Sequence, residues 1–331
     1  NTGRRLNNGL IRLGHSVLEF SDRDIVKHYK SIKDYSGAKT LNIKLINTVY
    51  NYKPDLLIFG HADLIKDDTL MYLKDNYKNL KISQWFLDPL VENGPDFNKN
   101  KSRILDKIEY TDANFITTSP DVLNFLPKKK LSLFMPNPTD PSFEVLNNFE
   151  NNHCSMDVFF ALSHGVHRGI LKKGKYDERA DFVNRLVEVT PNVKFDLYGI
   201  NNVQPIWADS FLKSISNAKM GVNLSRGNPI KYYSSDRITQ LIGNGLLTFI
   251  HKDTFYNDFF TSKEVIFYSG LSNLSEYIQK YAKDDKERKK IAKKGKAKYM
   301  KYFNSTIVAD YIINKTFEKS YKEGKYLWDK K

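Results

Sequence analysis

The sequence predicts an α/β protein with two domains, each built on a parallel β-sheet covered by helices. Three observations support this prediction. Short apolar runs alternate with helical patterns along most of the chain, which is typical of repeated β–α units. The length of 331 residues exceeds what one hydrophobic core usually organises. Residues 135–142 contain three prolines in eight positions and predict a stiff polar connector between the domains.

Five apolar runs in the first half are predicted to be strands, because each is short and bounded by polar or turn-forming residues. They cover residues 16–20, 55–59, 82–87, 113–117 and 131–135. Helices are expected between them. In residues 40–52, Leu41, Leu45 and Val49 share one face, and Pro54 prevents continuation of the helix. Residues 3–13 are predicted to be a loop that enters a helix, and we expect a first strand to precede them.

The second half repeats the pattern. Strands are predicted at residues 156–162, 193–198, 220–224, 246–250 and 265–267, and helices near 177–189, 207–216 and 236–242. From residue 271 onward the chain is predicted to be helical throughout. The aromatic-rich residues 317–328 are expected to pack back across the first domain.

These elements divide the chain into an N-terminal Rossmann-like domain (1–138), a C-terminal Rossmann-like domain (139–305) and a C-terminal helix (306–331) that crosses back to the first domain. The two sheets are expected to face a cleft. Ligands of open parallel sheets bind beyond the carboxyl ends of the strands, so functional residues are sought there.

Composition limits the compartment and the partners. The 52 Lys and Arg outnumber the 38 Asp and Glu, giving a net charge of +14, which favours a nucleic acid, an anionic membrane or a phosphorylated substrate as partner. The single cysteine, Cys154, excludes an internal disulfide and a thiolate cluster for zinc. No apolar run is long enough to span a membrane and no leader opens the sequence, so we expect a soluble, cytoplasmic protein.

Residues 283–302 carry ten Lys or Arg against three Asp or Glu. This pattern is typical of a solvated helix face. The alternative is attraction to an anionic surface at the inner face of a membrane, which would make the protein peripheral to it. No aromatic motif or recognition helix accompanies the charge, so nucleic acid is not the favoured partner.

The segment 223–249 predicts an anion site. A polar loop with Arg226 and Lys231 leads into Ser235 and Asp236, which are predicted to cap a helix and to leave its positive end facing the loop. The helix ends at residues 243–245, and residues 246–250 follow as a buried strand. A phosphate is the ligand that this arrangement favours.

Two further strand ends in the second half carry candidate residues. After residues 156–162, a glycine-bearing loop brings Arg168 and Lys173, which suit a diphosphate, although basic loop residues are more often only solvated. His164 and His167 in this loop lack a third ligand, so no metal site is predicted. After residues 193–198, Gly199 opens a loop where a nucleobase would fit, or a tight turn that needs glycine.

In the first half, His61 and Asp88 follow two predicted strands, and either would suit the role of general base. An isolated residue at such a place is more often a cap or a turn former. Gly3, Arg4 and Arg5 open the first helix, where they would approach a phosphate or sugar from the opposite wall of the cleft.

With these pieces in place, the chain resembles GT-B glycosyltransferases and, among them, the branch called CgeB-like or glycosyl transferases group 1. The resemblance covers nearly the whole length. It rests on residues 159–163 followed by Arg168, on 197–199, on 218–225 and most of all on 232–245. In the first domain it rests on residues 3–6, 14–15 and 84–88, and the proline connector stands where such enzymes join their two domains.

The resemblance implies a nucleotide-sugar donor, such as a UDP- or GDP-sugar, held by the second domain, and a glycan or lipid-linked acceptor of cell-surface polysaccharide biosynthesis held by the first. It implies neither an obligatory metal nor a cofactor, because positive side chains then stabilise the leaving diphosphate. The expected donor-binding residues are Arg168, Lys173, Gly199, Arg226, Lys231, Tyr233, Ser234, Ser235, Asp236, Arg237 and Gln240. The expected catalytic residues are His61 and Asp88, with Gly3, Arg4 and Arg5 on the acceptor or phosphate side.

One departure from the family pattern leaves the sugar open. Many relatives carry two glutamates at the positions of Tyr232 and Gln240. Gln240 still accepts a hydrogen bond from a ribose hydroxyl, but no carboxylate stands where the donor sugar is usually held. Two other functions stay open: a GT-B epimerase of nucleotide sugars, and a non-enzymatic module that binds nucleic acid or membrane through residues 283–301.

Overall fold

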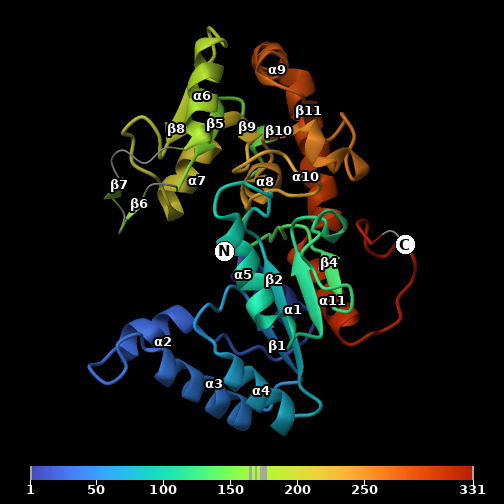
Figure 1. Ribbon diagram of the computed structural model, residues 1–331. Coiled ribbons are helices and arrows are strands. Elements are labelled where there is room, and N and C mark those ends of the chain that lie inside the picture. The colour runs from blue at the N-terminus through green and yellow to red at the C-terminus, as the bar shows by residue number, and fades with distance from the viewer. Residues whose placement is uncertain (1, 164–165, 168–169, 172–176, 330–331) are drawn as a thin grey trace.

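A computed structural model describes residues 2–163, 166–167, 170–171 and 177–329, which form two α/β lobes (Figure 1). The first lobe has a parallel sheet in the order β1-β2-β3-β4. Its strands are β1 Leu56–Phe59, β2 Lys81–Phe86, β3 Ala113–Ile116 and β4 Ser132–Phe134. Its helices are α1 Thr2–Arg12, α2 Asp22–Tyr29, α3 Ala38–Tyr52, α4 Asp67–Asn76 and α5 Phe97–Ile108, with a 3-10 turn η1 at Pro120–Val122.

The second lobe has a parallel sheet in the order β11-β10-β9-β5-β8. Its strands are β5 Met156–Ala161, β8 Phe195–Tyr198, β9 Ala218–Asn223, β10 Leu247–His251 and β11 Ile266–Tyr268, and β6 Val166–His167 pairs with β7 Ile170–Leu171 in a separate hairpin. Its helices are α6 Glu178–Glu188, α7 Ala208–Ser216, α8 Arg237–Gly243, α9 Leu271–Lys283 and α10 Asp285–Tyr302, with 3-10 turns η2 Asn148–Glu150, η3 Lys252–Thr254 and η4 Tyr256–Asp258.

The strand order of the second lobe creates a topological switch point. The chain leaves β5 toward β8 on one side, then returns to β9 on the other side of β5. Connections after β5 and after β9 therefore diverge, and a crevice opens between the carboxyl ends of these two strands.

The predicted α/β class with two parallel sheets is confirmed.

The ends of the predicted strands agree with the structure to within two residues, with one exception. Residues 16–20 are not a strand: residues 15–20 have no regular structure and pair with no other strand. Glu19 instead binds Arg4 and Asn7 of α1, and Leu18 is exposed, so the alternation of apolar residues here does not reflect a buried face.

The C-terminal part of the chain returns to the first lobe. Helix α11 (Ser305–Thr316) packs along α1, where a Cβ on Gly9 would lie 2.1 Å from the backbone oxygen of Ser305. Residues 317–329 follow as turns, so the prediction of an entirely helical C-terminus was wrong there. Glu318 adopts a positive φ of 52° directly after α11, which ends the helix. Trp328 stacks on Phe303 and belongs to the same buried cluster as Phe115 and Phe134 of the first-lobe sheet, which confirms that the C-terminal segment packs back on the first lobe.

Candidate functional site

Arg237, the first residue of α8, lies at the switch point. Its Nη1 donates to the backbone oxygen of Leu224, which follows β9, at 2.5 Å, and its Nη2 donates to that of Ala161, the last residue of β5, at 3.0 Å. The guanidinium stands 4.8 Å from the centre of the Phe160 ring. The side chain therefore bridges the two strand ends between which ligands of this sheet topology bind.

The charge of Arg237 has no carboxylate among its hydrogen-bond partners in the described chain. Its third partner, after the two carbonyl groups, is the hydroxyl of Ser235 at 3.2 Å. Burial, followed by the charge of Arg179, lowers the pKa of Arg237 to about 9, so the side chain still carries its charge at neutral pH. A half-buried cation with neutral partners favours an anion beside it.

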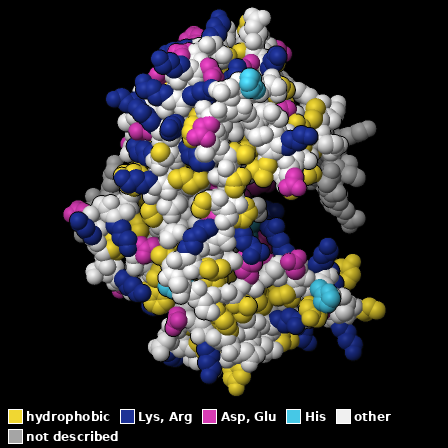
Figure 2. Space-filling model, turned by 180° about the vertical axis from the view of Figure 1, so that it is seen from behind, with side chains coloured by type: hydrophobic (Ala, Val, Ile, Leu, Met, Phe, Trp, Pro, Cys, Tyr) yellow, Lys and Arg dark blue, Asp and Glu magenta, His cyan; other side chains and the backbone are white. Residues whose placement is uncertain are grey.

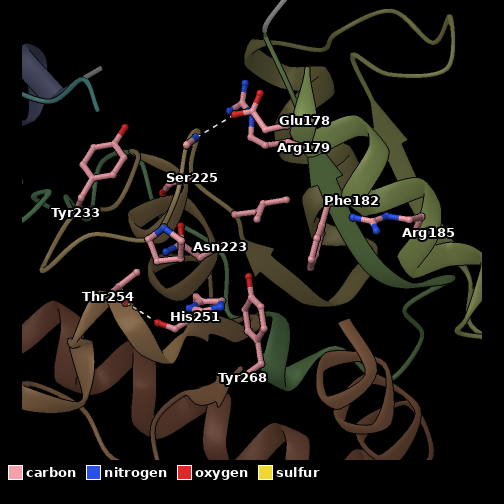
Figure 3. Close-up of a pocket in the computed structure, with 13 residues that line it drawn as sticks. Glu178, Arg179, Phe182, Arg185, Asn223, Ser225, Tyr233, His251, Thr254 and Tyr268 are labelled. Atoms are coloured by element: carbon pink, nitrogen blue, oxygen red, sulfur yellow. Dashed lines mark hydrogen bonds between the residues drawn. The ribbon is translucent and has the colours of Figure 1, made fainter. Parts of the chain in front are cut away.

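A pocket of about 280 Å³ lies beside Arg237 (Figure 3). Leu224 lines this pocket, and its backbone oxygen accepts the hydrogen bond from Arg237. Its walls come from the start of α6, the loop after β9, and the residues that end β10 and β11. They are Glu178, Arg179, Phe182, Arg185, Asn223, Leu224, Ser225, Gly227, Pro229, Tyr233, His251, Thr254 and Tyr268.

Two polar groups in this pocket are buried and have no hydrogen-bond partner in the described structure. They are Nδ2 of Asn223, whose residue is 4% exposed, and the hydroxyl of Tyr268, whose residue is 1% exposed. Figure 3 shows the Tyr268 hydroxyl directed toward the space between Asn223 and Phe182. Oδ1 of Asn223 already accepts from the hydroxyl of Ser234, so Nδ2 is the free end of the amide. Because unpaired buried groups are costly, this pair suits a ligand with hydroxyl groups.

The loop between β9 and α8 closes one side of the pocket. The backbone N–H of Gly227 donates to Glu178 of α6, and that of Ser235 donates to the hydroxyl of Ser225. Tyr233 is buried in the pocket wall, and burial, followed by the charge of Asp88, raises the pKa of its hydroxyl. The loop therefore holds Tyr233 between the pocket and the first lobe.

The same loop also joins the two lobes. Arg226 pairs with Asp96, and Lys231 with Asp121, both of the first lobe. A Cβ on Gly227, whose φ is +78°, would contact Val91 and Pro95. Arg226 and Lys231, which we expected at the donor, thus already hold carboxylates across the lobe boundary.

Asp236 does not cap α8, although the sequence predicted it. Its backbone is helical, with φ −54° and ψ −13°, and its side chain accepts no capping hydrogen bond. It accepts instead from Arg5 at 2.6 Å and from Thr2 at 3.3 Å, while Nε2 of Gln240 lies 3.5 Å from it. Because its backbone is helical and its side chain accepts no capping hydrogen bond, the prediction that Asp236 caps α8 was wrong.

The three residues that open α1 have separate surroundings. Arg5 is buried and donates to both oxygens of Glu144, at 2.5 and 3.2 Å, so its charge is fully paired. Arg4 is exposed and pairs with Glu19 at 2.9 Å. Gly3 lies beside the Trp85 ring, which a Cβ there would approach to 3.6 Å.

His61 and Asp88, which the sequence offered as alternatives, form one pair. Nε2 of His61 lies 3.2 Å from Oδ2 of Asp88, at the carboxyl ends of β1 and β2. Burial alone would raise the pKa of Asp88, but the hydrogen bond from His61 and the charges of His61 and Arg103 lower it overall. Asp88 therefore stays ionised at neutral pH and holds the imidazole in place. Figure 2 shows the surface hollowed between the two lobes.

The remaining predicted donor residues are only partly described. Gly199 has a φ of +74°, and a Cβ there would lie 1.9 Å from the backbone oxygen of Leu162, so the turn after β8 requires glycine. Arg168 and Lys173 lie outside the described residues.

Sequence reasoning missed Asn223, Tyr268 and Phe182. The strand-end rule pointed toward the first two, since Asn223 ends β9 and Tyr268 ends β11. Phe182 gave no signal, because an aromatic residue on a helix is usually part of a core. Among the residues that the structure describes, no three His, Cys, Asp or Glu side chains gather as metal ligands, and no helix is long and apolar enough to cross a membrane.

The chain is similar to known proteins in its second half and in its fold. Residues 178–314 match the family model described as glycosyl transferase-like. Similar solved structures include TarM of S. aureus, with TM-score 0.58 and 13% sequence identity. The match covers 85% of this chain and 58% of the TarM chain. Anabaena HepE in complex with UDP and glucose has TM-score 0.58 and 11% identity, covering 84% of this chain and 82% of HepE. Sucrose-phosphate synthase from Thermosynechococcus elongatus has TM-score 0.61 and 12% identity, and the match covers 96% of this chain and 93% of the synthase. No curated protein sequence matches the chain.

The two lobes with their parallel sheets define a protein of the GT-B fold, which confirms the resemblance to GT-B glycosyltransferases. Its residues 178–314 match the glycosyl transferase-like family model, which covers less than half of the chain. That segment contains Arg237 and all the residues that line the pocket beside it. Membership of the CgeB-like branch stays a prediction.

Proposed function

We propose that the chain is a glycosyltransferase that moves a sugar from a nucleotide-sugar donor to a glycan, a lipid-linked acceptor or a cell-surface polymer. The observation that carries this proposal is Arg237, a half-buried cation at the switch point whose partners are neutral oxygens. The diphosphate of a nucleotide sugar supplies the missing negative charge. HepE has been solved with UDP-glucose, and TarM with UDP and a glycan, which fits this donor class.

The donor diphosphate lies against Arg237 in this proposal, beside the end of β5, where Ala161 is already a partner of Arg237. Arg168 and Lys173 follow β5 in the sequence and are proposed as further donor-binding residues on the pattern of their loop alone. Positive side chains then stabilise the leaving group without a metal ion. The nucleoside is uridine, guanosine or a related base.

The glycosyl group of the donor occupies the pocket. Its hydroxyl groups accept from Nδ2 of Asn223 and exchange a hydrogen bond with Tyr268, the two unpaired groups of the wall. These neutral groups take the place of the carboxylate that relatives carry at position 232. Tyr232 itself donates to Asp258 at 2.5 Å and packs against Phe134 and Phe259, so it contributes to the core and not to the pocket.

The His61–Asp88 pair acts as the general base for an acceptor hydroxyl. The acceptor oxygen forms the new bond to the anomeric carbon, and the bond from that carbon to the diphosphate breaks. The proton of the hydroxyl moves to His61, whose positive charge Asp88 stabilises, while the electron pair leaves with the diphosphate beside Arg237. This sequence of events inverts the anomeric configuration.

The location that we propose is the cytoplasm, at an anionic membrane surface when the acceptor is linked to lipid. Helix α10 presents lysines that are exposed and lack an ion-pair partner in the part of the chain that the structure describes. They are Lys286, Lys293, Lys294 and Lys301. Lysines of this kind are attracted to anionic headgroups.

A panel of UDP-, GDP- and CDP-sugars tests the function. We expect one nucleotide class to raise the melting temperature of the protein, and its sugar to be transferred when a glycan or lipid-linked acceptor is added. Formation of an epimeric nucleotide sugar without acceptor would assign the chain to the epimerases. A panel in which no nucleotide sugar shifts the melting temperature contradicts the proposal.

A further inference from the structure

The turn between α2 and α3 exposes a cluster of large apolar side chains. Tyr29 is 40% exposed, Ile32 101% and Tyr35 89%. A single exposed apolar residue is ordinary, but an isoleucine without any cover between two exposed tyrosines is a patch. Figure 2 shows the projecting part of the lower lobe with apolar and basic side chains side by side.

This turn is a defined structure. Ser31 and Asp34 exchange two backbone hydrogen bonds, of 3.1 and 3.2 Å, which leaves Ile32 and Lys33 at its tip. The carboxylate of Asp34 accepts from the backbone N–H groups of Lys39 and Thr40 at the start of α3. The tip is therefore held on a helix, and its apolar side chains stay presented to solvent.

Positive charge surrounds the apolar tip. Four lysines around it are exposed and have no carboxylate partner in the described structure: Lys27, Lys30, Lys33 and Lys39. The nearest carboxylate in sequence, Asp34, is occupied by backbone N–H groups, and these hydrogen bonds lower its pKa. The tip thus combines exposed apolar side chains with four exposed lysines that are close to them in the sequence.

We propose that the α2–α3 tip docks on an anionic lipid surface, with Ile32 and Tyr35 inserted at the level of the headgroups and the four lysines against lipid phosphates. A projecting apolar tip suits a yielding surface whose interior is apolar and whose face is negative, whereas a protein partner would require a matching cavity. Tyrosine is also a residue that favours the membrane interface.

The position of the tip relates the docking surface to the site. In Figure 1, α2 projects from the first lobe on the side where the β6–β7 hairpin projects from the second, and Figure 2 shows the hollow between the lobes on this same side. A bilayer that touches the tip therefore runs past the opening between the lobes. This consequence rests on the proposed function, because it places a lipid-linked acceptor before His61, but the docking itself does not.

Helix α10 is the weaker candidate for the lipid contact, although its charge is higher. Its apolar residues Ile291, Ala292 and Tyr299 are buried in the core. Among the described residues, no large apolar side chain after Phe255 is exposed. Helix α10 offers attraction without insertion, so we assign the contact to the α2–α3 tip.

Sedimentation with vesicles tests the proposal. The full chain is expected to sediment with vesicles of phosphatidylcholine and phosphatidylglycerol, and much less with phosphatidylcholine alone. The double variant Ile32→Ser/Tyr35→Ser is expected to weaken this binding by about tenfold or more, since two apolar side chains lose their burial. The matched control Ile11→Ser, which removes an isoleucine of α1 that is 53% exposed, is expected to retain binding. The pair Lys293→Ala/Lys294→Ala is expected to weaken binding much less than the double variant, because α10 adds attraction without insertion.

Several outcomes overturn the assignment. Binding that survives the double variant, or is lost only with the α10 lysines, places the contact elsewhere. If the protein sediments with neither kind of vesicle, a lipid surface is excluded as the partner of the tip. If the wild type self-associates without vesicles and the double variant does not, the partner of the tip is a second copy of the chain. Nucleotide binding, measured on the same preparations, is expected to be unchanged in the double variant, so the donor site is judged independently.

Discussion

The two lobes differ at the carboxyl ends of their strands, in how many of the polar side chains there already have hydrogen-bond or ion-pair partners. In the first lobe, His61 binds Asp88, and Arg103 pairs with both Asp88 and Asp63. In the second lobe, among the residues that the structure describes, Arg237 meets only neutral oxygens, and the pocket beside it holds two buried groups without partners. Paired groups hold a catalytic side chain in position, whereas unpaired groups await a ligand. The contrast supports our proposal that the donor binds to the second lobe and that the first lobe supplies the general base.

The largest expected effect concerns the pair in the first lobe. His61→Ala is expected to slow single-turnover transfer by about 10²- to 10⁴-fold while donor affinity stays unchanged, because a general base contributes about that much. Asp88→Asn is expected to slow transfer less, since the imidazole remains. Asp63→Asn is the control, because Asp63 pairs with Arg103 and not with His61. Wild-type rates in both His61→Ala and Asp88→Asn would remove a side-chain base from the first lobe.

The connector between the lobes is expected to respond to acid. Burial would raise the pKa of Asp140, but hydrogen bonds from Arg12 and Ser305 lower it to about 2 from an ordinary 3.8. A folded-state pKa below the unfolded value stabilises the fold above about pH 4, and this contribution is lost as pH falls toward about 2. Asp140→Asn is expected to lower the free energy of unfolding by about 2 kcal/mol at pH 7.

Urea unfolding at several pH values measures this effect. The difference between wild type and Asp140→Asn is expected to shrink as the pH falls from about 4 toward about 2. The control Asp209→Asn changes an exposed aspartate of α7 and is expected to have little effect. An equal difference at pH 7 and at pH 2 would mean that ionisation of Asp140 does not hold the connector.

The unpaired groups of the second lobe predict opposite changes in stability and in binding. Tyr268→Phe removes a buried hydroxyl without a partner, so stability is expected to stay equal or to rise slightly. Affinity for the nucleotide sugar is expected to fall about tenfold, while affinity for the nucleoside diphosphate alone stays the same. Tyr281→Phe, a buried tyrosine of α9 outside the pocket, is the control. An equal loss for both ligands would place the glycosyl group elsewhere.

The smallest effect is expected at the boundary between the lobes. Arg226→Ala and Lys231→Ala each remove a partly exposed ion pair, so the free energy of unfolding is expected to change by less than about 1 kcal/mol. Small-angle scattering of the double variant is expected to show a larger radius of gyration, more so at low salt. Nucleotide affinity that falls as far as in Arg237→Ala would instead return both residues to the donor site.

Local patterns predicted most of the fold and part of the site. Apolar runs located the strands, because burial in a parallel sheet requires them, and the strand-end rule led to His61 and Asp88. Arg237 came from the resemblance to GT-B glycosyltransferases. Residues 16–20 looked like a strand because alternation alone carries no information about a partner strand. The partner of Asp236 is Arg5, 231 positions away, so its failure to cap α8 could not be read from neighbouring residues. The missing partners of Asn223 and Tyr268 are likewise a property of the tertiary structure.

Calorimetric titration with UDP, GDP and CDP tests most directly whether the second lobe binds a nucleotide at the switch point. We expect one of them to bind the wild type, and Arg237→Ala to weaken that binding by about 30-fold or more, since a hydrogen-bonded ion pair with the diphosphate is lost. Arg23→Ala, an exposed arginine of α2, is expected to bind like the wild type. Binding that is equal in Arg237→Ala and the wild type, or no binding of any of the three nucleotides by the wild type, would contradict the account.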